Sequence, residues 1–129
     1  MTADTALADT SFFVAIEQGR PFRGTAPVKY RVSIITIGEL RAGVLSASND
    51  TDRARRLRTL TTAMQVDPVP VTDDVATAWA ELRSALRSAK RSMPVNDSWI
   101  AATAIALGIP VATQDDDYDD IPGLEVVRL

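Results

Sequence analysis

Four acidic residues occupy positions from which their carboxyl groups could act together on a cation. Asp9 follows the apolar segment ALA, Glu39 lies within IITIGEL, Asp97 precedes SWIAATA, and Asp115 comes two residues after IPVAT. Carboxylates within a few ångströms of one another stay ionised together only when a cation joins them; otherwise some take up protons. Oxygen ligands select hard cations such as Mg²⁺ or Mn²⁺, which can lower the pKa of a bound water and stabilise charge on a phosphoryl group.

The composition removes most other kinds of catalytic group. The 129 residues include no Cys and no His, so disulfides, thiolate ligands and imidazole groups are all excluded. Carboxylates, hydroxyl groups, Lys, Arg and a metal ion held by oxygen atoms remain. The net charge of −3 indicates that the chain as a whole is not a general binder of polyanions.

Each acid also has a purely structural explanation. Asp9 could cap the helix that follows it, and Glu39 could complete a capping box with Thr36. Asp97 could complement the dipole of its helix, and the acidic run at 115–120 could be a solvated turn. The matching placement of four acids favours a joint site over four unrelated structural roles.

A particular arrangement of strands and helices must bring these distant acids together. We expect strands at residues 6–8, 31–36, 66–71, 109–113 and 124–129, of which the third is weakened by two prolines. We expect helices at residues 10–18, 37–48, 52–65, 73–90 and 97–107. Strands that alternate with helices predict an α/β fold with a parallel sheet covered on both faces. Sites in such sheets form beyond the carboxyl ends of the strands, where the acids stand.

The ends and the length of the chain bear on its location and its domain organisation. The segment MTADTALADTSFF lacks the basic region and the long apolar run of a signal peptide. No stretch reaches the ~18 to 20 apolar residues that cross a membrane. We therefore expect a cytoplasmic protein that makes no membrane contact. A chain of this length is expected to form a single domain over residues 1–129.

Four segments of the sequence together resemble a known family. They are LADTSFFVA, SIITIGELRAG, NDSWIAATAIALGIPVATQDDDY and IPGLEVVRL. The chain resembles the PIN-domain ribonucleases, specifically the VapC-type toxins of bacterial type II toxin–antitoxin pairs. DTS and ELR are weak signals alone, whereas the long third segment and the order and spacing of all four are specific.

The resemblance implies both a fold and a set of site residues. It implies a three-layer α/β/α sandwich whose parallel sheet of about five strands has the order 3-2-1-4-5. It implies that Asp9, Glu39, Asp97 and Asp115 form an acidic quartet that binds Mg²⁺ or Mn²⁺. Asp117 is our second choice of ligand, because this chain has three consecutive acids where relatives usually have one or two. The supporting residues that the resemblance implies are Thr10, Ser11, Asn96 and Thr113.

The resemblance further implies an activity and its partners. It predicts a metal-dependent endoribonuclease that cleaves structured RNA, such as tRNA or rRNA, and thereby inhibits translation. It also predicts a homodimer that is neutralised by a cognate VapB-type antitoxin, whose C-terminal segment would cover the groove near the acids. An alternative is a non-catalytic PIN-like module whose acidic pocket serves only to bind a partner protein.

Two further classes of α/β protein gather aspartates at strand ends, and the sequence disfavours both. A receiver domain needs an acceptor Asp at the end of its third strand, but Asp67 stands at the beginning of that strand, and no Lys follows residue 90. A phosphatase of the haloacid type needs D-x-D after its first strand, where this chain reads DTS.

Basic residues must offset the repulsion between an acidic centre and RNA. We select Arg41, and then Arg53 and Arg56, as candidate RNA-binding residues. Arginines on amphipathic helices equally often only face water. Trp79 and Trp99 could stack on bases, but we favour the core for Trp79 and the core or a dimer contact for Trp99.

Overall fold

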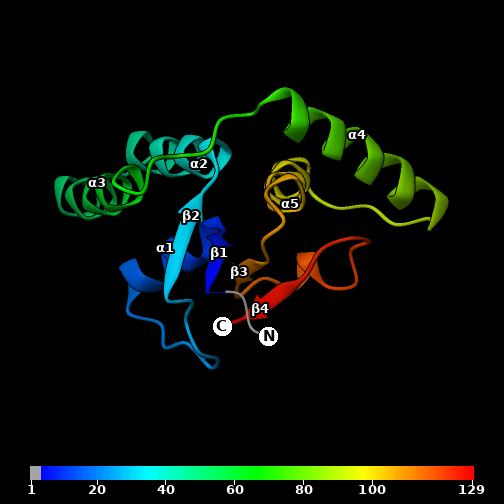
Figure 1. Ribbon diagram of the computed structural model, residues 1–129. Coiled ribbons are helices and arrows are strands. Elements are labelled where there is room, and N and C mark those ends of the chain that lie inside the picture. The colour runs from blue at the N-terminus through cyan, green and yellow to red at the C-terminus, as the bar shows by residue number, and fades with distance from the viewer. Residues whose placement is uncertain (1–3) are drawn as a thin grey trace.

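The computed structural model describes residues 4–129, and its centre is a four-stranded parallel sheet in the order β2-β1-β3-β4. The strands are β1 (Thr5–Ala8), β2 (Lys29–Val32), β3 (Val111–Thr113) and β4 (Val126–Arg128). The helices are α1 (Thr10–Gln18), α2 (Ile34–Leu45), α3 (Asp50–Met64), α4 (Asp73–Ser88) and α5 (Val95–Leu107), with a 3₁₀-helix, η1 (Asp116–Tyr118). Figure 1 shows these helices around the short strands.

Side chains of the strands point alternately into two hydrophobic clusters. Ala6 and Ala8 of β1 pack with α1, α2 and α3, whereas Leu7 between them packs with α4 and α5. In β3, Ala112 joins the first cluster and Val111 the second. Helices therefore cover both faces of the sheet, and the predicted three-layer α/β fold is confirmed (Figure 1).

The expected strand at residues 66–71 is reduced to a single bridge. Val69 pairs with Ser33 in parallel, through bonds from Val69 N to Val32 O (2.8 Å) and from Ile34 N to Val69 O (2.9 Å). The prolines on both sides of Val69 have no N–H to donate, so pairing does not extend along the chain. The prediction of about five strands is corrected to four, and the order of those four agrees with the predicted order.

The largest local error concerns residues 31–36, which were expected to form one strand. β2 ends at Val32, and α2 begins at Ile34 because the Ser33 hydroxyl accepts a hydrogen bond from Ile35 N at 3.0 Å. The predicted capping box between Thr36 and Glu39 does not form, since Thr36 already lies inside the helix. Glu39 is consequently placed on the second turn of α2 rather than the first.

The other helices lie within a few residues of their expected ranges. Asp9 caps α1, and Thr72 caps α4 by accepting from Val75 N at 3.3 Å. α5 ends as expected at Gly108, whose φ of 68° lies in the left-handed region that favours glycine. Within the part of the chain that the structure describes, no helix is both long and apolar enough to cross a membrane.

Candidate metal centre

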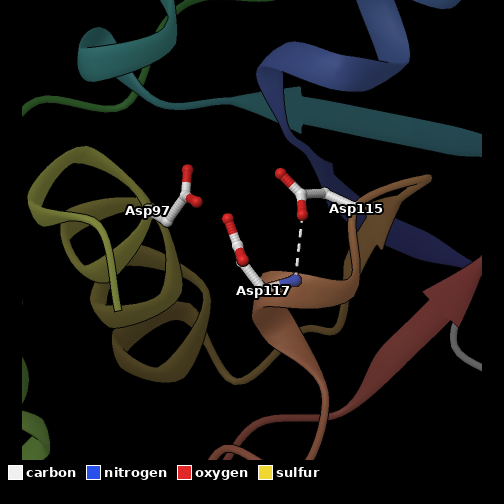
Figure 2. Close-up of side chains that lie close together, drawn as sticks. All are labelled: Asp97, Asp115 and Asp117. Carbon is white, nitrogen blue, oxygen red and sulfur yellow. Dashed lines mark hydrogen bonds between the residues drawn. The ribbon is translucent and has the colours of Figure 1, made fainter. Parts of the chain in front are cut away.

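Three aspartates converge at the carboxyl edge of the sheet. One carboxylate oxygen from each of Asp97, Asp115 and Asp117 lies within 4.8 Å of the others. Figure 2 shows these side chains pointing toward one another from the start of α5, from the end of β3 and from η1. Asp97 and Asp115 are half-buried and Asp117 is exposed, so the group opens to solvent on one side.

The turn after β3 sets the positions of two of these aspartates. The Thr113 hydroxyl accepts a hydrogen bond from Asp115 N at 2.8 Å, and Asp115 Oδ1 accepts from Asp117 N at 2.9 Å. The second bond caps η1 and turns Asp117 back toward Asp115 (Figure 2). Asp117, our second choice of ligand, therefore belongs to the cluster together with Asp115.

Burial, together with the crowding of these carboxylates, raises the pKa of Asp97 to about 7. Burial is the largest cause, followed by a hydrogen bond with Asp117 and the negative charge of Asp115. The Tyr118 hydroxyl opposes the shift by donating to Asp97 Oδ1 at 3.2 Å. A divalent cation would relieve the same repulsion, so the three side chains fit an oxygen-bound Mg²⁺ or Mn²⁺.

Asp9 lies beside the cluster but has a different environment. It is 2% exposed, and its Oδ1 accepts from the Ser11 hydroxyl at 2.7 Å and from Phe12 N at 3.1 Å. Its Oδ2 accepts from the Thr113 hydroxyl at 2.6 Å. Burial raises the pKa of Asp9, and the negative charge of Asp115 adds to this rise. The two carboxyl groups therefore lie within electrostatic reach of each other. Asp9 thus caps α1 and lies outside the group of three, within electrostatic reach of Asp115.

Glu39 connects α2 to the starts of α1 and α5. Its Oε1 accepts from the Thr10 hydroxyl at 2.6 Å, and its Oε2 accepts a long bond from the Asn96 side chain at 3.5 Å. The hydroxyl of buried Thr36 also lies 3.1 Å from the Thr10 hydroxyl. Glu39 lies outside the group of three aspartates, and these contacts tie it to the segments that carry Asp9 and Asp97.

The three arginines selected from the sequence contact groups other than the three aspartates. Arg41 contacts the sulfur of Met64 at 3.9 Å, and Arg53 pairs with Asp50 at 3.0 Å. Arg56 donates to the Gly43 carbonyl at 2.7 Å and lines a cavity of about 170 Å³ that Glu39 also lines. Arg56 is therefore the one of these three arginines that the structure places beside a predicted acid.

The two tryptophans stack on each other. The rings of Trp79 and Trp99 are 4.3 Å apart with an angle of 3° between their planes, and Trp79 Nε1 donates to the Ser98 hydroxyl at 3.0 Å. Both are half-buried and also pack against the cluster of Val75, Ala78 and Ala102, which agrees with the core position favoured from the sequence.

Sequence reasoning did not select Tyr118, which contacts Asp97 directly. Its side chain is fully buried although the residues on both sides of it are aspartates. Burial raises the pKa of the Tyr118 hydroxyl, as do the charges of the nearby aspartates, so this group stays protonated and donates. A lone aromatic residue within an acidic run was the available signal, because such a ring must find an apolar place.

The sequence matches the model of the PIN domain over residues 6–124. The chain therefore belongs to the PIN-domain family, and the resemblance noted from its sequence segments is confirmed.

Two curated relatives from Mycobacterium tuberculosis match over nearly the full length. The chain is 49% identical to Ribonuclease VapC4 over 131 aligned positions, which cover 100% of both proteins. It is 39% identical to Ribonuclease VapC5 over 132 positions, which cover 99% of this chain and 98% of that protein. A crystal structure of VapBC-5, a member of the VapBC family of toxin–antitoxin systems from the same organism, covers 98% of this chain and 100% of its own, with 35% identity and a TM-score of 0.86.

Proposed function

We propose that this protein is an endoribonuclease toxin of the VapC type that depends on Mg²⁺ or Mn²⁺. The observation that carries the proposal is the convergence of the oxygens of Asp97, Asp115 and Asp117 within 4.8 Å. The relatives at 49% and 39% identity both bear the name ribonuclease, which supports the choice of RNA. Residues 1–129 act as a single domain, in the cytoplasm, on structured RNA such as tRNA or rRNA, and the cleavage inhibits translation.

The residues of this chain have distinct roles in the proposed reaction. Asp97, Asp115 and Asp117 would hold the cation, and Asp9 would support it from the buried side of the group. When bound, Mg²⁺ or Mn²⁺ lowers the pKa of a water and offsets negative charge on the phosphoryl group. The Tyr118 hydroxyl donates to Oδ1 of Asp97 and thereby restrains this carboxyl group beside the other two aspartates.

Glu39 is suited to orient the attacking water and to accept its proton. Thr10 occupies Oε1 with a bond of 2.6 Å, whereas Oε2 has only the long contact with Asn96. Oε2 therefore keeps acceptor capacity for a water. In hydrolysis the water oxygen bonds to phosphorus and the bond from phosphorus to the 3′ oxygen breaks, which leaves a 3′-hydroxyl and a 5′-phosphate.

The proposal includes protein partners. The solved structure of VapBC-5 comes from a toxin–antitoxin system, and this supports a cognate VapB-type antitoxin as the partner of this chain. The antitoxin's C-terminal segment would cover the groove beside the aspartates and neutralise the enzyme. We also propose that the chain forms a homodimer, which sedimentation of the antitoxin-free protein would measure.

The second candidate function is a non-catalytic module that keeps the acidic pocket only for its partner. The capping of α1 by Asp9 favours it, because that carboxylate already has a complete structural role. The two functions differ in whether the antitoxin-free protein cleaves RNA.

A nuclease assay on purified, antitoxin-free protein tests the proposal. We expect cleavage of a tRNA mixture with Mg²⁺ or Mn²⁺, none with EDTA, and at least a 100-fold loss in Asp97→Asn, the order of effect of removing one electrostatic contribution at a reacting centre. Asp120→Asn is the matched control, because Asp120 is exposed, lies in the same acidic run and is outside the group of three. Full activity of Asp97→Asn would contradict the proposed role of the metal.

A further inference from the structure

A hollow of about 490 Å³ borders the segment that carries Asp115 of the candidate metal centre. Gln114 and Asp116, the two neighbours of Asp115 in the chain, form one of its sides. Arg20 and Arg23, from the connection between α1 and β2, and Arg128, at the end of β4, form the rest together with main chain. We call this hollow the arginine pocket after these three arginines.

The arginine pocket carries an excess of positive charge. Three guanidinium groups line it, and the one acidic side chain among its lining residues, Asp116, pairs with Arg128, which leaves the charges of Arg20 and Arg23 in excess. Among residues 4–129, Arg20 and Arg23 form no ion pair and their side chains make no hydrogen bond, and both are exposed. No ion pair or side-chain hydrogen bond among the described residues therefore explains why arginine stands at these two positions.

Arg128 links the end of β4 to the acidic run. Its Nη1 lies 3.2 Å from Asp116 Oδ1, and its Nη2 pairs with Asp119. Because these two carboxylates already engage Arg128, Arg20 and Arg23 are the arginines of the pocket that remain open to an anionic ligand among the described residues.

Two contacts between distant segments build the arginine pocket. The Gln114 side chain donates to the Pro21 carbonyl at 3.1 Å, which holds the α1–β2 connection against the end of β3. A Cβ atom on Gly24 would lie 2.1 Å from the Arg128 carbonyl oxygen, so only glycine allows this close approach to β4. Figure 1 shows the connection after α1 running beside the C-terminal end of β4.

We propose that the arginine pocket binds a backbone phosphate of the RNA adjacent to the phosphate that is cleaved. Guanidinium groups suit phosphate because their planar N–H donors form paired hydrogen bonds with its oxygens. The pocket shares the 114–116 segment with the metal centre, so a strand that crosses the aspartates would pass the arginines next. This inference rests on the proposed function, because RNA is the ligand in both.

The salt dependence of RNA affinity tests this inference. We would measure the affinity for fluorescein-labelled, unfractionated tRNA in EDTA over a series of salt concentrations. Each phosphate contact contributes about 0.7 to 0.9 to the slope of log affinity against log salt. The double variant Arg20→Gln, Arg23→Gln should lower this slope by about 1 to 2. Arg87→Gln, an exposed arginine on α4 far from the pocket in sequence, is the control and should keep the slope of the unmodified protein.

Three outcomes would overturn the inference, and they differ from one another. If the unmodified protein binds and cleaves tRNA but the double variant keeps its slope, the arginine pocket fails while the proposed function stands. If the double variant keeps its slope but loses binding of a poly-glutamate peptide, the pocket takes an acidic protein segment instead. If the unmodified protein neither binds nor cleaves tRNA, the proposed function fails and the inference with it.

Discussion

The carboxyl group of Asp97 combines three influences that act in opposite directions. Burial and the neighbouring aspartates raise its pKa to about 7, whereas the Tyr118 hydroxyl donates to it and lowers the pKa. A carboxylate with such a pKa is partly protonated near neutral pH, and a bound cation would displace that proton. Repulsion between the carboxylates therefore destabilises the fully ionised group until a cation binds.

Stability without a divalent ion should fall as the pH rises through the range set by Asp97. The pKa of Asp97 is about 7 in the folded chain against 3.8 as its ordinary value, so between these values the folded state binds more protons than the unfolded state. The free energy of unfolding consequently decreases with rising pH in this window. Thermal unfolding in EDTA should give a lower midpoint at pH 7.5 than at pH 5.

Asp97→Asn should remove part of this pH dependence. Added Mg²⁺ should raise the unfolding midpoint of this variant less than that of the unmodified protein. A slope of stability against pH that is the same in both proteins would show that Asp97 is not the group responsible.

Tyr118→Phe should weaken cation binding while the fold is retained. The ring is fully buried and would remain, but the hydrogen bond of 3.2 Å to Asp97 would be lost. Removing a side chain that orients a metal ligand typically costs about 10-fold or more in metal affinity. Calorimetric titration with Mn²⁺ would measure the change. Tyr30→Phe is the control, because Tyr30 packs on the aromatic rings of α1 outside the acidic group, and equal losses in both variants would argue against a specific role for Tyr118.

The acidic run also shows where residue-level prediction from sequence ends. Asp97 and Asp115 could be selected because each borders an apolar element at a strand end or a helix start. Asp117 was ranked second to Asp115 from the sequence, because the sequence does not show its direction, which depends on η1 and on the cap that the Asp115 carboxylate provides. The contact of Tyr118 with Asp97 depends on the apolar cluster in which its ring packs, and the sequence alone does not show that cluster.

At the scale of elements, the boundary between β2 and α2 decides where Glu39 lies. The β-branched residues of RVSIIT favour a strand, yet the cap at Ser33 and the burial of Thr36, Ile37 and Leu40 start the helix at Ile34. Tertiary packing outweighs strand propensity here, and a single sequence does not contain that information. The cap at Asp9 depends on local sequence alone, and it was recognised from the sequence as one possible role of that residue.

Gly24→Ala and Gly38→Ala should change stability in opposite directions. A Cβ on Gly24 would collide with the Arg128 carbonyl, and overpacking of this kind costs about 1 to 3 kcal/mol. A Cβ on Gly38 would meet nothing within 4 Å on an exposed turn of α2, so alanine should add about 0.5 to 1 kcal/mol through its helix propensity. Urea unfolding of both variants measures the two effects. A neutral or stabilising Gly24→Ala would show that the contact with β4 is loose.

At the scale of the whole molecule, the parallel sheet gathers opposite charges along one edge. The carboxyl end of β3 brings Asp115 close to Asp97 at the start of α5, the end of β1 places Asp9 within electrostatic reach of Asp115, and the end of β4 adds Arg128. The sequence indicated that acids from distant segments approach this edge, because alternating strands and helices permit few arrangements; of the four acids it selected, Asp97 and Asp115 lie in the group of three. It did not predict the arginine pocket, because Arg20 and Arg23 approach β4 only through the close contact at Gly24.

The most direct test of the central claim is the position of Mn²⁺ in crystals of the protein, read from its anomalous scattering. The account predicts a peak between Asp97, Asp115 and Asp117, about 2 Å from an oxygen of at least two of them, and loss of that peak in Asp97→Asn. Well-ordered aspartates with no peak between them at millimolar Mn²⁺, or a peak bound elsewhere on the molecule alone, would contradict it.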